Sequence, residues 1–164
     1  MFLLVLGIVR PVASDWFQRQ GMIAASRDPA RALDCFLWST STDPDRVEGW
    51  RQLALTAFRL GRLPLALQAM QAAHDLAPDY ANLNGELGSL LAMQGRYTEA
   101  AVLLTRATQL YPRDATNFAK LARILLALNR TPQARAALDV ALQLDPENPL
   151  VKLTAKEMSQ QKRP

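Results

Sequence analysis

The chain has 164 residues with a formal net charge of +4, and 49% of its residues are hydrophobic and 21% are charged. This balance is typical of a soluble chain long enough for one domain or one repeat array, and it excludes a disordered or fibrous protein. The basic residues are scattered along the chain and do not cluster with aromatic residues, so we expect no binding of nucleic acid.

The chain begins with the apolar run MFLLVLGIV, residues 1–9, followed by Arg10 and Pro11. A membrane-spanning helix needs roughly 20 apolar residues, so this run alone is too short to span a bilayer. Three interpretations of the segment 1–12 stay open. It is the core of a signal peptide, although no positive residue precedes it; or a short helix packed on the next element; or the end of a transmembrane helix that begins in an upstream segment.

A 34-residue period organises the chain after this segment. Pro44, Pro78, Pro112 and Pro146 follow one another at this spacing, and self-similarity at a fixed period is the signature of a repeat protein. The same period relates several other columns: Ala32, Ala66, Ala100 and Ala134; Ser39, Ala73, Ala107 and Ala141; Phe36, Met70, Leu104 and Leu138; Leu53, Leu87 and Leu121, each followed by the small residue Ala54, Gly88 or Ala122; Gly61, Gly95 and Asn129; and the aromatic column Trp16, Trp50 and Phe118, interrupted by Asn84.

Each period has the chemistry of a helical hairpin. Within residues 47–60, apolar residues recur every three or four positions, which predicts an amphipathic first helix. Gly61 and its equivalents end that helix, because the residue after the last turn often adopts a positive φ. Pro64 or Pro132 then lies in the first turn of a second helix, with Thr131 as a predicted N-cap. Alanines seven positions apart on the second helix allow close helix packing.

This column pattern resembles the tetratricopeptide repeat, a family of 34-residue helix–turn–helix units. The resemblance implies an all-α fold, a right-handed α-solenoid. It covers three clear repeats at 47–80, 81–114 and 115–148, and a degenerate first repeat at 13–46, where Arg19, Gln20 and Arg27 replace expected residues. Residues 149–164 form a terminal capping helix and a polar tail, with Lys152, Lys156 and Glu157 facing water.

The sequence contains no combination of residues that is typical of a catalytic site. His74 is the only histidine and has no patterned acid or nucleophile beside it, so we interpret it as a helix residue. Cys35 is the only cysteine, which excludes an intrachain disulfide and a cysteine zinc site. Trp16, Trp38 and Trp50 are interpreted as packing residues. The aspartates Asp28, Asp43, Asp45, Asp79, Asp114 and Asp145 stand at helix junctions and are interpreted as caps. We expect no enzyme activity, no cofactor and no metal.

The family resemblance also implies a binding surface, because the first helices of tetratricopeptide repeats line a concave groove that takes peptides or partner helices. An apolar floor with mixed charge suits an amphipathic helix or an extended peptide. The residues at the matching positions are Glu48, Arg51, Gln52, Leu55, Phe58 and Arg59 in one repeat; Asn82, Glu86, Ser89 and Met93 in the next; and Thr116, Lys120, Arg123 and Ala127 in the last.

One sub-family binds chaperones through a clamp of lysine, asparagine and arginine that holds a C-terminal carboxylate. The matching positions here hold Arg51, Leu55, Glu86, Thr116 and Lys120. Both asparagines are missing and Glu86 would repel a carboxylate, so we expect no chaperone clamp.

These features predict a non-catalytic scaffold that binds a protein or peptide in the groove. The alternative is an accessory domain of a larger bacterial membrane protein of the glycan ligase or polymerase type, because the layout of the N-terminus resembles the C-terminal tail of O-antigen ligase-type proteins. We expect a bacterial protein at a membrane, through residues 1–9, or in the cytoplasm, and a periplasmic one if the segment is a signal peptide. Self-assembly through the N-terminal edge is a further possibility.

Overall fold

The computed structural model describes the backbone of residues 2–160 and the side chains of residues 12–80 and 82–160. The chain forms two compact units, Met1–Ala77 and Pro78–Pro164, which are described separately. In the described residues all regular secondary structure is helical. The prediction of an all-α fold is therefore confirmed.

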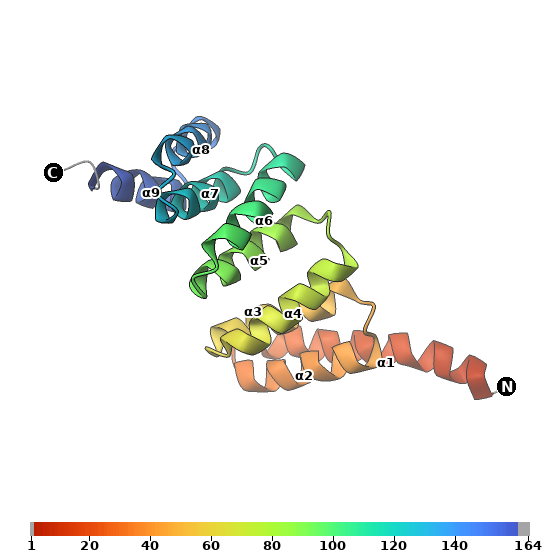
Figure 1. Cartoon of the computed structure of the whole chain (residues 1–164). Coiled ribbons are helices and arrows are strands. Elements are labelled where there is room, and N and C mark those ends of the chain that lie inside the picture. The colour runs from red at the N-terminus through yellow and green to blue at the C-terminus, as the bar shows by residue number, and fades with distance from the viewer. Residues whose placement is uncertain (1, 161–164) are drawn as a thin grey trace. The chain divides into compact units, whose positions relative to one another are not determined.

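The first unit consists of two helical hairpins. The helices α1 (Phe2–Ala24) and α2 (Pro29–Thr42) form one pair, and α3 (Val47–Arg59) and α4 (Leu63–Leu76) form the other, with α2 packed against α3 (Figure 1). The backbone of α1 continues across the expected boundary between residues 12 and 13. Residues 2–9 of the apolar run are therefore the start of the helix that carries the first repeat, and the side chains of residues 1–11 lie outside the described ones.

The second unit consists of two hairpins and a terminal helix. The helices α5 (Ala81–Met93) and α6 (Tyr97–Leu110) pair with each other, as do α7 (Ala115–Ala127) and α8 (Thr131–Leu144). The helix α9 (Pro149–Gln160) packs mainly on α7 (Figure 1). The bounds of α3, α5 and α7 are offset by the predicted period, so the same sequence columns produce the same helices.

The turns inside the hairpins repeat in atomic detail. Gly61 and Gly95 have φ of 72° and 77°, and Asn129 has φ of 58°, as predicted for residues that end a helix in the left-handed region. In each turn the backbone N–H after this residue donates to a carbonyl five residues earlier, at 2.9 Å for Arg62 to Ala57 and 3.0 Å for Arg96 to Leu91. The corresponding bond from Arg130 to Leu125 is 2.8 Å long.

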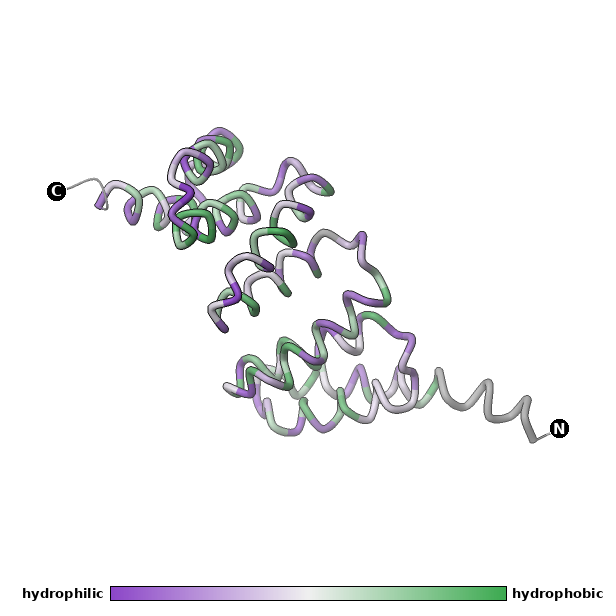
Figure 2. Tube along the Cα trace, viewed as in Figure 1, coloured by the Kyte–Doolittle hydropathy of each residue, from purple (hydrophilic) through white to green (hydrophobic). Residues whose placement is uncertain are grey.

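The predicted columns form the core of both units. Figure 2 shows hydrophobic and hydrophilic residues alternating along the helices, as amphipathic packing requires. Gly88 permits close approach of α5 and α6, since a Cβ there would lie 3.0 Å from Cγ of Leu104. The column residues that are completely inaccessible to solvent include Ala32, Ala66, Ala100, Ala134, Phe36, Met70, Leu104, Ser39, Ala73, Ala107 and Ala141.

Two residues of the aromatic column, Trp50 and Asn84, make equivalent hydrogen bonds. The Trp50 indole N–H donates to the carbonyl of Pro44 at 2.7 Å, and the Asn84 amide donates to the carbonyl of Pro78 at 2.7 Å. Asn84 thus replaces tryptophan while keeping the bond to the repeated proline. Trp16 and Trp38 pack against the ring of Phe17, but they are 56% and 60% exposed and do not belong to the core.

The helix caps agree only in part with the sequence analysis. Asp28 accepts a bond from the Arg31 N–H at 3.0 Å and caps α2, and Asp114 accepts from the Thr116 N–H at 2.9 Å and caps α7. The N-cap predicted at Thr131 is wrong, since α8 already includes Thr131 and makes no side-chain cap bond. At a different helix, α9, Asn148 is a cap that was not predicted, because its side chain accepts from the Leu150 N–H at 3.0 Å.

Candidate functional site

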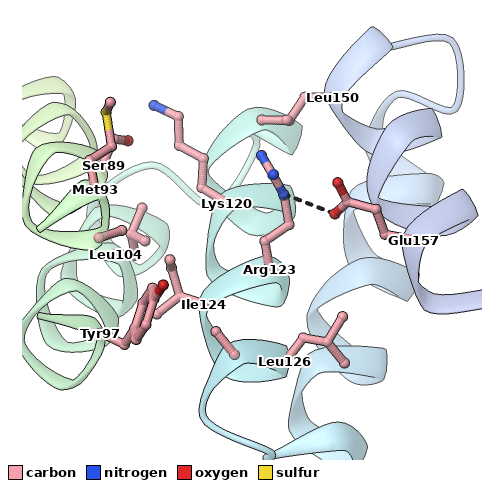
Figure 3. A pocket seen from close by; sticks show the side chains of 12 residues that line it. Ser89, Met93, Tyr97, Leu104, Lys120, Arg123, Ile124, Leu126, Leu150 and Glu157 are labelled. Carbon is pink, nitrogen blue, oxygen red and sulfur yellow. Dashed lines mark hydrogen bonds and ion pairs between the residues drawn. The ribbon is translucent and has the colours of Figure 1, made fainter. Parts of the chain in front are cut away.

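The second unit contains an open cavity of about 570 Å³ where α5, α7 and α9 come together (Figure 3). The helices α5 and α7 are first helices of their repeats, and α9 stands in the register of a first helix one period after α7. Tyr97 and Leu104 from α6 close the cavity from one side, and Ile124 lies beside them in Figure 3. The cavity is therefore built largely from the helices that the sequence analysis expected to carry a binding groove.

Several predicted groove residues line this cavity. Ser89 and Met93 come from α5, and Lys120, Arg123 and Ala127 come from α7. The side chain of Met93 is 59% exposed, so a flexible apolar side chain is available to a ligand at the rim. Together with the apolar residues of α6 and α7, these side chains give an apolar surface with cations along one side.

An ion pair joins α7 to α9 across the cavity. Nε of Arg123 donates to Oε2 of Glu157 at 3.0 Å, and both side chains are partly exposed (Figure 3). Arg123 and Glu157 occupy the same repeat column in consecutive units, so the period could have identified Glu157 as a lining residue. The sequence analysis missed Glu157 and Leu150 because α9 was interpreted as a cap facing water, and it missed Tyr97 because that residue lies on the second helix α6.

Lys120 reaches from α7 toward α5. Its Nζ donates to the carbonyl of Gly85 at 3.5 Å, which is a long hydrogen bond. Burial lowers the pKa of Lys120 below its usual value, and the nearby carboxylates of Glu86 and Asp114 partly oppose this effect by raising it. The ammonium group is thus partly desolvated at the wall of the cavity, where an acidic or carbonyl group of a ligand would interact with it strongly.

The remaining predicted residues of the second unit lie outside the cavity lining. Asn82 is exposed and Glu86 is half-buried on α5. The Thr116 hydroxyl accepts a bond from the Asn148 side-chain amide at 3.2 Å, so Thr116 connects α7 to the cap of α9.

The predicted residues of the first unit lie along α3 and form a separate candidate surface. Glu48 accepts a bond from the Gln52 amide at 2.6 Å and pairs with Arg51 at 3.4 Å, so three of these polar groups interact with one another. Phe58 is 39% exposed and Leu55 is half-buried. Arg59 is exposed at the end of the helix. The α3 surface therefore offers one aromatic and one aliphatic side chain beside a polar cluster.

The groups that could carry other chemistry are dispersed. His74 is half-buried near the end of α4, with Nδ1 3.9 Å from the Asp75 carboxylate, and Cys35 is a half-buried free thiol on α2. Within residues 2–160, no three histidine, cysteine or acidic side chains are placed to hold a metal ion. In the same part of the chain no helix has both the length and the apolar character needed to cross a membrane.

Comparison with protein families identifies the fold. Sequence models described as tetratricopeptide repeat match the chain over residues 24–81 and over residues 91–157. The chain belongs to the tetratricopeptide repeat family. The matched ranges cover most of the repeats predicted from the 34-residue period. A comparison with curated proteins finds no match to the chain.

Solved structures show the same tetratricopeptide fold at low sequence identity. MamA residues 41 to the end from Desulfovibrio magneticus RS-1 aligns with a TM-score of 0.83 and 18% identity, over 92% of this chain and 85% of that one. The pilF protein of Pseudomonas aeruginosa aligns with a TM-score of 0.80 and 24% identity, over 94% of this chain and 71% of that one. YrrB, described as a tetratricopeptide protein with an unusual peptide-binding site, aligns with a TM-score of 0.78 and 22% identity, over 88% and 75%.

Proposed function

We propose that the chain is a non-catalytic interaction scaffold that binds a peptide or helix of a partner protein in the α5–α7–α9 cavity. The observation that carries this proposal is the convergence of predicted groove residues from two repeats, Ser89 and Met93 on α5 with Lys120 and Arg123 on α7, on one open cavity. Its apolar floor and polar rim have the composition of peptide-binding grooves. The peptide-binding site in the description of YrrB supports this assignment by analogy alone.

The chemistry of the rim favours a ligand with an apolar anchor next to an acidic or carbonyl group. The apolar anchor would contact Met93, Tyr97 and Leu150, which line the cavity and are accessible, and the acidic or carbonyl group would lie near Lys120. Arg123 is paired with Glu157, so this pair supplies both a donor and an acceptor at the rim. The ligand site proposed here therefore differs from the clamp that the sequence analysis excluded, in which several cations and asparagines converge on one carboxylate.

The test is selection of binding peptides from a displayed random library on the full chain, followed by affinity measurements on matched variants. Ala127 lines the cavity and is exposed, so Ala127→Trp fills the cavity without disturbing the core. Ala136→Trp, at an exposed position on α8, is the control. We expect Ala127→Trp to weaken the selected peptides at least about tenfold, or about 1.4 kcal/mol, and Ala136→Trp to leave them unchanged. If the selected peptides bound both variants with equal affinity, they would not bind in the cavity, and this part of the proposal would be wrong.

The α3 surface is the second part of the same proposal, and it is tested independently. Phe58→Ala removes the exposed aromatic side chain, which is the residue type most often found at binding hot spots. Loss of binding on Phe58→Ala, with binding retained on Ala127→Trp, would assign the ligand to the first unit instead of the second.

We also propose the alternative that this chain serves as an accessory domain of a larger bacterial membrane protein of the glycan ligase or polymerase type. The apolar sequence 2–9 within α1 favours this alternative. Gene sequence upstream of the Met1 codon tests it: a continuous reading frame with apolar spans supports the alternative, and a stop codon close to Met1 removes it.

A further inference from the structure

In the described part of α1, polar residues are buried against the rest of the unit and large apolar residues are exposed, the reverse of the usual arrangement. Ser14 and Gln18 are buried, with 0% and 5% exposure, and Gly21 is buried beside them. These residues are four and three positions apart, so they form one face of the helix, which we call the inward face. Val12, Trp16 and Ile23 lie on the opposite side, the outward face, and are 67%, 56% and 68% exposed.

The inward face is held to α2 by hydroxyl groups and a glycine. The Ser14 hydroxyl donates to the Ser39 carbonyl at 3.2 Å, and the Ser39 hydroxyl donates to the Ser14 carbonyl at the same distance. Oε1 of Gln18 lies 3.3 Å from the Ser39 hydroxyl and is a second acceptor within reach of the same proton. Gly21 is needed because a Cβ at this position would lie 2.6 Å from the ring of Phe36. The α1 side of this contact thus consists of small and polar residues, and α2 contributes the buried ring of Phe36 together with Ser39. Small residues and hydroxyl bonds between helices are common where the outer surfaces of helices contact lipid.

The outward face continues into an aromatic cluster over both helices. The rings of Trp16 and Phe17 meet edge to face at 5.0 Å, and Phe17 stacks on Trp38 at 6.1 Å. Trp38 is 60% exposed on α2. A water-exposed helix would place apolar residues inward and polar residues outward. Tryptophans with one apolar side and one polar N–H are enriched where a protein meets the bilayer surface.

Charged side chains of both signs lie beside this apolar surface, and Asp34 shares a small hollow with Trp38. Arg19 lies between Trp16 and Ile23 along α1, with its side chain 76% exposed and its guanidinium paired with Asp15 at 3.0 Å. At the end of α1, Ile23 shares a small cavity of about 210 Å³ with Arg27 and Arg31, and with Asp28, which caps α2. Long basic side chains beside an apolar helix face can keep their alkyl stems in the apolar layer and their charges at lipid phosphates.

We infer that the outward face of α1, together with Trp38, docks on the surface of a lipid bilayer. The sequence 2–9, which contains no charged residue, belongs to the same helix. Since no described helix is suited to cross a membrane, the docking is peripheral in the described part of the chain. This inference concerns the first unit and does not depend on the cavity of the second.

The test is flotation of the full chain with vesicles of phosphatidylcholine and phosphatidylglycerol in equal parts. The outward-face variant is Val12→Gln/Trp16→Gln/Ile23→Gln. Its matched control is Val102→Gln/Tyr111→Gln/Leu153→Gln, which removes three apolar side chains that are 66%, 57% and 46% exposed in the second unit. We expect the wild type and the control to float, and the partition coefficient of the outward-face variant to fall at least about tenfold. Equal flotation of both variants, or no flotation of the folded wild type, would overturn the inference.

Two further measurements separate the bilayer from a protein partner. In a Trp38→Phe/Trp50→Phe variant, Trp16 is the only tryptophan, and we expect brominated lipids to quench its fluorescence on binding. Floating without such quenching would show that Trp16 does not contact lipid and would contradict the inference. Sedimentation without lipid is the second measurement: a dimer of the wild type that becomes a monomer in the outward-face variant would assign the surface to a second copy instead.

Discussion

The first and last helices of the described chain, α1 and α9, differ in which residue types they expose to water and which they bury. The helix α9 buries Val151, Thr154 and Met158 against α7 and α8 and exposes Lys152 and Lys156, with Leu153 as a single exposed large apolar residue. The helix α1 buries a serine and a glutamine and exposes Val12, Trp16 and Ile23. Both helices occupy the position of a first helix in a tetratricopeptide repeat, and only α9 has the polar outer face that a terminal repeat needs in water.

This difference shows that position in a repeat does not determine which side of a helix is apolar. The columns of the period place Trp16 with Trp50, yet no described helix precedes α1 and covers Trp16. On the side that faces α2, α1 makes hydroxyl bonds through Ser14 and a glycine contact with the ring of Phe36. The two ends of the chain are therefore suited to different surroundings, water at α9 and an apolar surface at α1.

The largest expected effect comes from making the same substitution at both ends. Val151 is fully buried in α9 and Val12 is 67% exposed in α1. Val151→Ala should lower the free energy of unfolding by about 2 kcal/mol, from lost burial and a residual cavity. Val12→Ala should change it by no more than about 0.5 kcal/mol. Urea unfolding of both variants checks this, and a large loss for Val12→Ala in the absence of lipid would mean that its side chain is covered by protein.

A somewhat smaller effect tests the polar packing of α1. Ser39 stands in a column that holds alanine in the other repeats, so the column alone predicts that Ser39→Ala is harmless. The structure predicts a cost of about 1 to 2 kcal/mol, because the buried Gln18 amide oxygen loses its donor. Thermal or urea unfolding measures this cost. The control is Ala73→Ser on α4, which makes the reverse substitution at the position equivalent to Ser39 in the next repeat.

The same site allows a double-mutant cycle. Gln18→Leu removes the acceptor that Ser39→Ala leaves without a partner. If the two side chains interact as described, the double variant should lose less stability than the sum of the single variants, by at least about 0.5 kcal/mol. Additive losses would show that Ser39 and Gln18 are not coupled, and that α1 is held to α2 by other contacts.

Much of the fold could be predicted because a strict period assigns each column to one side of a helix. The fully buried Ala66, Ala100 and Ala134 follow directly from this argument, as do the left-handed Gly61, Gly95 and Asn129. The continuation of α1 back to residue 2 could not be predicted from the repeat, since residues 2–11 have no counterpart in the period. The prediction of Thr131 as an N-cap was wrong because it assumed that α8 begins at Pro132, whereas the helix begins at Thr131.

The candidate site was predicted less completely than the fold. The period identified Ser89, Lys120 and Arg123 as off-core positions of first helices, and these residues do line the cavity. A cavity also depends on helices from the next repeat and on second-helix residues such as Tyr97, which a search restricted to first helices omits. Glu157 is a lining residue because α9 packs on α7, and a polar sequence alone does not distinguish that arrangement from a water-facing cap.

The smallest expected effect concerns the ion pairs of the two terminal helices. Asp15 on α1 accepts from Arg46, the N-cap residue of α3, at 2.9 Å, and Glu157 on α9 accepts from Arg123 on α7 at 3.0 Å. The hydrogen bond from Arg46 lowers the pKa of Asp15, desolvation opposes this effect, and the charge of Arg19 adds to the lowering. Because the pKa is lowered on folding, the stabilisation is present above the usual aspartate pKa. It is lost as the pH falls through the lowered value.

Asp15→Asn should therefore flatten the acid side of the stability curve between about pH 5 and about pH 2, with a smaller change at neutral pH than either substitution above. Asp34→Asn, at an exposed carboxylate of α2 that makes no ion pair in the described residues, is the control and should keep the wild-type slope. Unfolding free energies across this pH range measure both. If Asp15→Asn kept the full acid dependence, the ion pair between Asp15 and Arg46 would contribute none of it.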